Sequence, residues 1–411
     1  MINPEKVDTI IIGAGLAGLA CARELHASGS SYVICEAADR VGGRVATDLH
    51  EGYRLDRGFQ VLLTAYPEAR RLLDYAALDL RRFYPGAMVR HGGKWHRVAD
   101  PFRHPIDGLS GVFNPVGTFA DKLRVGWLRL GGFDFSRHAD SCSTLQALKS
   151  EGFSESMIDR FFRPFLNGVF LENQLSTSVR KLEFVMKHFA RGDTAIPALG
   201  MAEIPQQLAA PLDPASIRLN TRVESIGENG IRLANGEFLA ARNIVVATEA
   251  PAANQLLDIT SPPTISNAAT CLYFTTASAP SNEPILFLNG ENDGPVNHLV
   301  VLSAVSPAYA PAGQHLISVN VVDPVAAAAP DLEQRVSQQV AGWFGDAVAG
   351  WRLLRVDRIP HAVPAQQVIE EKSVRVRKGI YQCGDHCGVA SIDTALASGS
   401  AAARAILEDR T

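Results

Sequence analysis

The first apolar pattern in the chain predicts a strand, a helix and a second strand. Residues 9–12, Thr-Ile-Ile-Ile, form a β-branched apolar run of the kind that fills a parallel strand buried on both faces. The following segment predicts a helix over residues 16–27, and a second apolar run over residues 32–35 ends at Glu36. These segments predict a β-α-β unit with a parallel sheet, and hence an α/β fold.

Three glycines stand between the first strand and the helix. Gly13, Gly15 and Gly18 have the spacing G-x-G-x-x-G. In that pattern the first glycine permits a tight turn, the second lets a pyrophosphate approach the backbone, and the third lets the helix pack closely on the strand. Glu36 lies about 20 residues further on, where an acidic side chain accepts hydrogen bonds from a ribose. This context predicts a dinucleotide site rather than an ordinary glycine-rich turn.

A cationic glycine loop follows the second strand. Gly42 and Gly43 lie between Arg40 and Arg44. The order of the segments places this loop beside a bound pyrophosphate, where Arg44 or Arg40 would pair with phosphate and the glycines would let the chain pass close to the cofactor. The alternative is a solvated basic turn.

Helical periodicity replaces the β-α-β pattern over residues 66–190, which indicates a separate substrate region. Residues 161–170 are rich in aromatic side chains, which favours an apolar cavity, although core filling is the stronger interpretation for any single ring. The expected elements are helices at residues 66–80, 119–130, 143–150 and 154–162 and a strand-like piece at residues 87–98.

One of these helices has apolar residues at helical spacing, namely Phe119, Leu123, Gly126 and Leu130, with basic residues interleaved. The pattern fits an interfacial helix that rests on a membrane. A buried helix with a basic outer face is the favoured interpretation, so peripheral membrane contact is not expected.

The chain then returns to the first region. Asn235-Gly236 predicts a hairpin turn. Later strands and loops alternate and predict a mostly antiparallel sheet that completes the substrate region. The expected elements are strands at residues 216–219, 221–226, 231–233, 237–239, 243–248, 271–276, 285–288, 298–304, 316–321 and 352–359 and a helix at residues 331–344.

The last segment repeats the order of strand, glycine and helix. A strand ends at Gly384-Asp385, and a helix of small residues begins near Ser391. No catalytic nucleophile and no metal site stands out. His298 and His361 are isolated histidines, for which a structural role is favoured over a catalytic one.

Composition narrows the class of protein. The 411 residues have a net charge of −4, without the basic excess of a nucleic-acid-binding protein. The six cysteines are scattered and show neither a disulfide framework nor a metal pattern, so a reduced, cytoplasmic protein is expected. No signal peptide and no uninterrupted apolar run of about 18 residues is found, so no membrane span is expected.

Residues 8–18, Glu36 and residues 41–44 together resemble the N-terminal signature of the flavin amine oxidase superfamily. That superfamily includes monoamine and polyamine oxidases, protoporphyrinogen oxidase and the phytoene desaturases. Residues 200–208 and the Gly384-Asp385 segment resemble later parts of the same pattern. A plain NAD-binding unit has no G-G-R element at this place.

The resemblance implies FAD as the cofactor. Gly13, Gly15, Gly18 and Arg44 would meet the pyrophosphate, Glu36 the adenosine ribose, Val223 the adenine, residues 57–60 the isoalloxazine and Asp385 the ribityl or phosphate region. For Phe59 a plain core position is a serious alternative. No cysteine stands between residues 359 and 381 to attach the flavin covalently, so non-covalent binding is expected. The candidate cofactor residues are Gly13, Gly15, Leu16, Ala17, Gly18, Glu36, Arg40, Gly42, Gly43, Arg44, Arg57, Gly58, Phe59, Gln60, Val223, Gly384, Asp385, Ile392 and Ala395.

The expected fold is a Rossmann-like FAD-binding domain of the GR2 type with a discontinuous α+β substrate domain. The FAD domain would comprise residues 1–65, 191–260 and 365–411, and the substrate domain residues 66–190 and 261–364. By the resemblance, the strand at residues 243–248 closes the parallel sheet.

The resemblance implies an FAD-dependent oxidoreductase that removes hydride from an apolar or conjugated substrate. Asp385, where amine oxidases usually carry glutamate, favours the desaturase-like members. No second G-x-G-x-x-G for NAD(P)H is found, so oxygen, a quinone or another acceptor would reoxidise the flavin. The alternatives are an amine oxidase that releases peroxide, a redox-neutral flavin isomerase and a non-catalytic lipid or prenyl carrier.

Overall fold

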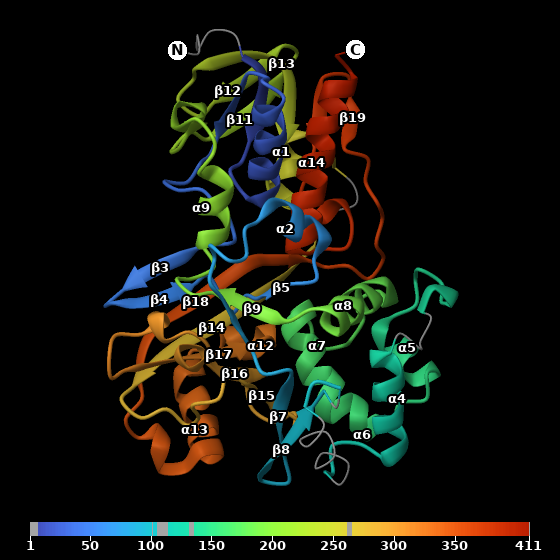
Figure 1. Cartoon of the computed structure of the whole chain (residues 1–411), viewed down its shortest axis with the longest axis vertical. Helices are drawn as coiled ribbons and strands as arrows, with labels where there is room; N and C mark the ends of the chain where they lie inside the picture. The colour runs from blue at the N-terminus through green and yellow to red at the C-terminus, as the bar shows by residue number, and fades with distance from the viewer. Residues whose placement is uncertain (1–6, 101, 105–113, 131–134, 261–264, 411) are drawn as a thin grey trace.

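The computed structural model describes residues 7–100, 102–104, 114–130, 135–260 and 265–410. The two largest sheets lie one above the other in Figure 1, and a group of helices lies beside the lower one. The first helix, α1 (Leu16–Ala27), and the last, α14 (Ile392–Glu408), pack side by side at the top of this view. A Cβ at Gly399 would lie 2.1 Å from the carbonyl oxygen of Ala17, so only glycine permits this approach.

The upper sheet contains the predicted parallel layer. Its parallel strands lie in the order β10, β2, β1, β13, β20, so their carboxyl ends share one edge. These strands are β10 (Ile217–Arg218), β2 (Tyr32–Cys35), β1 (Val7–Ile12), β13 (Phe238–Val246) and β20 (Ile380–Gln382).

Both faces of the central strand are covered. Ile11 of β1 belongs to the core formed with α1 and α14. Ile10 packs on the other side with the short strands β11 (Val223–Gly227) and β12 (Gly230–Leu233). This two-sided burial explains why residues 9–12 are a continuous apolar run.

Two predictions about this sheet were wrong. The segments 237–239 and 243–248 form one strand, β13, whose first part pairs antiparallel with β12 and whose last part pairs parallel with β1 and β20. The segment 243–248 therefore does not close the layer, because β20 lies beyond it. The predicted Asn235-Gly236 hairpin is confirmed, since it joins β12 to β13.

The lower sheet has seven strands in the order β18, β14, β17, β16, β15, β7, β8, and only the β15–β7 pairing is parallel. The piece at 87–98 is a hairpin, since Gly92 and Gly93 turn the chain with positive φ. The strands are β7 (Gly86–His91), β8 (Lys94–Ala99), β14 (Ser266–Thr276), β15 (Leu286–Asn289), β16 (His298–Val301), β17 (His315–Val321) and β18 (Arg352–Pro364).

The helices beside this sheet lie at the right of Figure 1. A short π-helical segment, Ile158–Phe162, joins α6 to α7, so the predicted helix at 154–162 continues to Phe170. These helices are α4 (Phe119–Arg129), α5 (Thr144–Ser150), α6 (Glu155–Met157), α7 (Arg163–Phe170) and α8 (Val179–Arg191).

Two other expected elements differ from the structure. The helix predicted at 66–80 ends after one turn and a half as α2 (Pro67–Leu72), because Leu73 is extended and the Asp74 side chain accepts hydrogen bonds from the N–H groups of Ala76 and Ala77. The strand predicted at 298–304 ends at Val301, where a helical turn begins.

The shorter elements complete the chain. These elements are β3 (Thr47–His50), β4 (Tyr53–Asp56), β5 (Leu62–Leu63), β6 (Leu80–Arg82), β9 (Thr194–Pro197), β19 (Arg375–Arg377), α9 (Glu203–Ala209), α10 (Ala250–Leu256), α11 (Leu302–Val305), α12 (Pro324–Ala328) and α13 (Leu332–Phe344). The boundaries between the FAD-binding and substrate domains stay a prediction.

Candidate cofactor and substrate cavity

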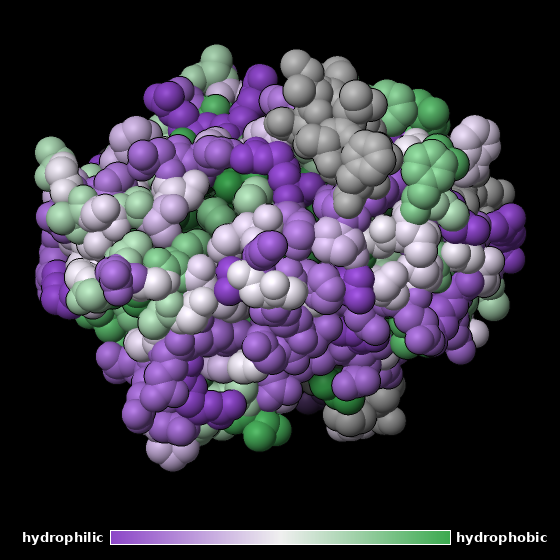
Figure 2. All heavy atoms as spheres, turned by 90° about the horizontal axis from the view of Figure 1, so that it is seen from below, coloured by the Kyte–Doolittle hydropathy of each residue, from purple (hydrophilic) through white to green (hydrophobic). Residues whose placement is uncertain are grey.

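One large cavity, about 1490 Å³, extends from the carboxyl edge of the parallel layer to the lower sheet and helices. Its walls include the glycine turn after β1, the N-terminus of α14, and residues of α7, α8 and β18. Such a position, at the carboxyl ends of parallel strands, is where open α/β sheets bind ligands. In Figure 2 the lower face of the molecule shows a hollow with apolar side chains inside a largely hydrophilic rim.

The glycine turn combines one open and two crowded positions. A Cβ at Gly18 would lie 2.0 Å from the carbonyl oxygen of Gly13, and Gly13 itself has φ of +105°. A Cβ at Gly15 would meet no atom within 4 Å, and Gly15 lines the cavity. The turn is therefore closed toward the protein at Gly13 and Gly18 and open toward the cavity at Gly15. The open position leaves the N-terminus of α1 accessible to a phosphate.

The acidic residue after β2 is oriented by the turn. One carboxylate oxygen of Glu36 accepts a hydrogen bond from the Ala14 N–H at 2.6 Å, and the other accepts from the Ala38 N–H at 2.8 Å. Glu36 lines the cavity, as does Val223 at the start of β11. Because a carboxylate has further lone pairs, Glu36 can still accept hydrogen bonds from ribose hydroxyls.

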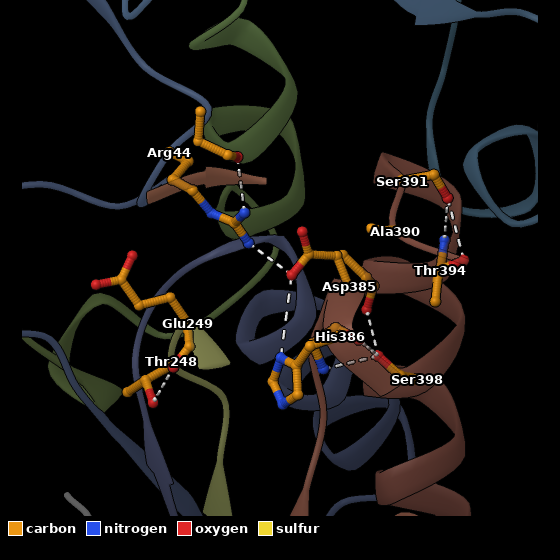
Figure 3. Close-up of polar contacts among 12 residues, drawn as sticks. Arg44, Thr248, Glu249, Asp385, His386, Ala390, Ser391, Thr394 and Ser398 are labelled. Carbon is orange, nitrogen blue, oxygen red and sulfur yellow. Dashed lines mark hydrogen bonds and ion pairs between the residues drawn. The ribbon is translucent and has the colours of Figure 1, made fainter. Parts of the chain in front are cut away.

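An ion pair in the cavity wall joins the two glycine segments, between the half-buried Arg44 and the buried Asp385. The guanidinium of Arg44 donates to Oδ1 of Asp385 at 2.7 Å and to the carbonyl oxygen of Ala362 at 3.0 Å (Figure 3). Burial alone would raise the pKa of Asp385, but the Arg44 guanidinium lowers it below its usual value. The Asp385 carboxylate is therefore ionised. Its ion pair with Arg44 joins two segments that are distant in sequence at the cavity wall.

The segment after Asp385 presents a helix N-terminus to the cavity. The Ser391 hydroxyl caps α14 by accepting a hydrogen bond from the Thr394 N–H at 3.0 Å. Ser398, one turn further on, accepts from the Gly384 N–H at 2.9 Å (Figure 3). Ile392 and Ala395 line the cavity beside this end of the helix. The helix dipole places positive potential there, which favours a group that carries negative charge.

The segment 57–60 lines the same cavity. Gln60 Nε2 donates to the carbonyl oxygens of Arg44 at 2.8 Å and Arg57 at 2.9 Å, which fixes the loop. The Phe59 ring lies 5.3 Å from the ring of His298 and 5.9 Å from that of Phe83. Phe59 thus both lines the cavity and packs against the core.

Asp56 anchors this segment. Its carboxylate accepts hydrogen bonds from the Thr47 hydroxyl, the Met201 N–H at 3.0 Å and the Tyr309 hydroxyl at 2.8 Å. The side chain is almost completely buried, and burial raises the pKa of Asp56 to about 6 despite these donors. Asp56 therefore ties β4 to two distant segments just before the chain enters the cavity wall.

Replacing Asp56 by asparagine is expected to remove one pH-dependent contribution to stability. Because the folded-state pKa is raised, the folded protein binds this proton between about pH 4 and pH 6 while the unfolded chain has released it, so the contribution falls as pH rises. Relative to Asp56→Asn, the wild type should lose on the order of 2 kcal/mol between those pH values. Urea unfolding of both proteins at the two pH values measures this difference. A difference that does not change with pH would contradict it.

Two candidate residues do not line the cavity. Arg40 forms an ion pair with Asp48 at 2.5 Å, so of the two arginines predicted as alternatives for the phosphate, Arg44 lies in the cavity wall and Arg40 does not. Gly18 lies away from the cavity, where the absence of a side chain lets α1 pack closely on the turn. The other candidates are brought together at the cavity wall, namely Gly13, Gly15, Leu16, Ala17, Glu36, Gly42, Gly43, Arg44, Arg57, Gly58, Phe59, Gln60, Val223, Gly384, Asp385, Ile392 and Ala395.

Several cavity residues were not predicted. His298 lies in the wall beside Phe59, and burial lowers its pKa to about 3, so the ring is neutral. Its Nδ1 lies 2.9 Å from the side-chain nitrogen of Asn297. His361, by contrast, is exposed and does not line the cavity. Sequence spacing gave no signal for His298, because its neighbours come from other segments.

Aromatic rings of α7, of α8 and of the π-helical segment that precedes α7 form an apolar wall. Phe161 stacks on Phe165 with 5.7 Å between ring centroids, and Phe165 lies 5.3 Å from Phe189. Phe162 and Phe184 line the same cavity. Phe162 is also fully buried in the core, so the cavity and core interpretations both apply to this segment. No cluster of three or more potential metal ligands occurs among the described residues.

Comparisons with known proteins agree with this geometry. The chain is 25% identical to 15-cis-phytoene desaturase from an Oncidium hybrid cultivar over 276 residues, which cover 60% of this chain and 47% of the desaturase. The chain therefore spans about half the length of that relative.

Solved structures share the fold over almost the whole chain. An oxidoreductase from Methanosarcina mazei has a TM-score of 0.75 at 16% identity and covers 98% of this chain and 100% of its own. Cyclohexylamine oxidase from Brevibacterium oxydans has a TM-score of 0.68 at 19% identity and covers 98% of this chain and 99% of its own. Residues 16–407 match the family described as flavin containing amine oxidoreductase. The chain therefore belongs to the flavin containing amine oxidoreductase family.

Proposed function

We propose that the chain is an FAD-dependent oxidoreductase that removes hydride from an apolar or conjugated organic substrate, in the manner of the desaturases, and passes the electrons to oxygen or a quinone. The observation that carries the proposal is a single cavity that begins at the glycine turn and ends at the aromatic wall of α7 and α8. The likeness to phytoene desaturase supports the substrate class.

The residues at the sheet edge fit FAD held without a covalent bond. Gly15 is open toward the cavity, Glu36 is oriented beside it, and Arg44 and the N-terminus of α14 supply positive charge. When bound there, FAD would supply the hydride acceptor. The residues of the chain orient the two molecules and keep the reacting carbon away from water.

The walls suit a substrate without a large polar surface. His298 is neutral and the Phe165 ring packs between two others, so this part of the cavity binds through apolar contact. Loss of hydride would leave a conjugated cation, which completes the new double bond by releasing a proton from the adjacent carbon to water.

An absorbance spectrum of the purified protein tests the proposal. Flavin bands that bleach anaerobically and return slowly in air support a desaturase-like dehydrogenase. Bands that return quickly, with peroxide released from amines, would establish an amine oxidase instead. Substrate conversion without consumption of an acceptor would indicate an isomerase. A colourless protein that FAD does not reconstitute would contradict an enzyme and favour a lipid or prenyl carrier.

We also propose that α4 rests on a membrane surface and that the apolar substrate enters from there. The expected buried face of this helix is in fact exposed, since Phe119, Leu123, Trp127 and Leu130 are each more than half exposed. Leu128, on the other side of α4, lines the cavity. Hydrophobic residues gather at the right of Figure 2, on the side where α4 lies in Figure 1. No described helix is long and apolar enough to cross a membrane.

Replacing Phe119, Leu123 and Trp127 together by serine is expected to weaken vesicle binding at least about tenfold, because each buried large apolar side chain contributes about 1.5–3 kcal/mol. Flotation with phosphatidylcholine vesicles measures the bound fraction. The matched control replaces three exposed apolar residues elsewhere, Phe238, Ile265 and Val325, by serine. Equal binding by both triple variants would contradict the assignment to α4.

A further inference from the structure

A lysine lies buried in the wall of the cavity. Lys181 is in the first turns of α8, and only 3% of the residue is exposed. It lines the cavity together with Phe184 and Val185, which lie three and four positions further along the same helix. Helical geometry places these three residues on one face, so Lys181 is a cation within an apolar surface.

The ammonium group has no polar partner in the described part of the chain. Among the described residues, the ammonium instead lies over the Phe170 ring, whose centroid is 5.6 Å from Nζ. The nearby carboxylates are those of Asp385 and Glu172, and neither forms an ion pair with it. A buried lysine is normally paired, so this one is an exception.

Both carboxylates are engaged by other donors. Asp385 accepts from Arg44 at 2.7 Å. One oxygen of Glu172 accepts from the Thr177 N–H at 3.1 Å and the Thr177 hydroxyl at 3.0 Å, and the other accepts from the Gln174 N–H at 2.6 Å. Lys181 therefore lines the cavity without a carboxylate dedicated to its charge.

Lys181 remains largely charged near neutral pH. Burial lowers its pKa to about 8, while Asp385 and Glu172 act to raise it. An ammonium in an apolar wall attracts a negative group and repels a positive one, and the interaction is stronger there than in water.

We propose that Lys181 binds a carboxylate carried by the substrate, so that the substrate is an apolar or conjugated acid rather than an amine. This inference rests on the proposed function and narrows its substrate class. The ammonium would donate a charge-assisted hydrogen bond to the carboxylate, with the apolar body of the substrate against the aromatic wall of α7 and α8. A protonated amine would meet a like charge at the same place.

Binding of two matched probes to the flavin-loaded full-length protein tests the proposal. Retinoic acid and retinol share a conjugated apolar body and differ in the carboxylate. At pH 7 the wild type is expected to bind the acid at least about tenfold more tightly than the alcohol, since a hydrogen bond to a charged group contributes about 1.5–3 kcal/mol. Equilibrium dialysis gives both dissociation constants.

The variant Lys181→Met should lose this preference and bind retinol as the wild type does. Its fold is expected to persist, because removal of Lys181 leaves no hydrogen-bonded partner unsatisfied. Circular dichroism and the unfolding temperature check this. Lys187→Met, on an exposed position of the same helix, is the control and should keep the preference.

Each other outcome overturns the proposal in a distinct way. Equal affinities in the wild type, or a preference that survives in Lys181→Met, would contradict the role of Lys181 and leave the proposed function intact. A preference that survives while the reduction potential of the bound flavin shifts would assign the charge to the flavin instead. Failure of the wild type to bind either probe would overturn the apolar substrate class, and this inference with it.

Discussion

Replacing Gly15 by leucine is expected to abolish flavin binding in a chain that still folds. Gly15 has φ of −71° and ψ of 179°, an extended conformation that leucine adopts without strain. A Cβ there meets no protein atom within 4 Å, so the longer side chain would extend into the cavity. It would cover the free N–H groups at the N-terminus of α1, where the diphosphate of FAD is proposed to bind.

The expected effect is a rise of more than about 100-fold in the dissociation constant for FAD, because several hydrogen bonds of about 1 kcal/mol or more are lost together. Titration of flavin-free protein with FAD measures it, and the unfolding temperature of the flavin-free variant should stay near that of the wild type.

Gly342→Leu is the matched control, since Gly342 is an exposed helical glycine whose Cβ also meets nothing within 4 Å. Full flavin content in Gly15→Leu would contradict the proposed diphosphate position. A Gly15→Leu chain that fails to fold would contradict the open space seen at this residue.

The different roles of Gly15 and Gly18 could be predicted from the sequence alone. Both roles follow from local geometry, since strand, turn and helix lie within a few residues of one another. The sequence therefore predicts β1, the turn and α1 closely. The role of Arg40 stays a prediction, and its ion pair with Asp48 of the next strand could not be read from local spacing.

The unpredicted cavity residues depend on long-range packing. Lys181 and His298 lie on different elements, α8 and β16, and meet the same cavity only after the lower sheet and the helices assemble. A local signal for Lys181 existed, since it shares the buried face of α8 with Val185 and His188, but amphipathic helices often carry a lysine at the edge of that face. For α4, helical spacing predicts the helix but not which face is exposed.

The Arg44–Asp385 pair gives the largest expected effect on stability. Replacing Arg44 by methionine would leave the Asp385 carboxylate buried without its partner. Removal of one member of a buried ion pair costs about 3–5 kcal/mol. His386 does not replace Arg44, because burial lowers the pKa of its ring to about 4 and leaves it neutral. Because the Arg44 side chain is 34% exposed, solvent screens part of this cost, and urea unfolding of the flavin-free protein at pH 7 should show a loss of about 2–3 kcal/mol for Arg44→Met.

A second substitution separates this charge effect from lost packing. Asp385→Asn in the Arg44→Met background removes the buried charge and should restore part of the stability, with a coupling of about 1–3 kcal/mol between the two positions. Because burial raises the pKa of Asp385 once Arg44 no longer lowers it, the carboxyl group of Arg44→Met should take up a proton as pH falls from 7 toward 4, whereas the wild-type carboxylate stays ionised. The penalty of Arg44→Met should accordingly be smaller at pH 4 than at pH 7. Additive losses in the double variant, or a penalty that is independent of pH, would show that Arg44 stabilises this wall through its packing and its bond to Ala362 rather than through Asp385.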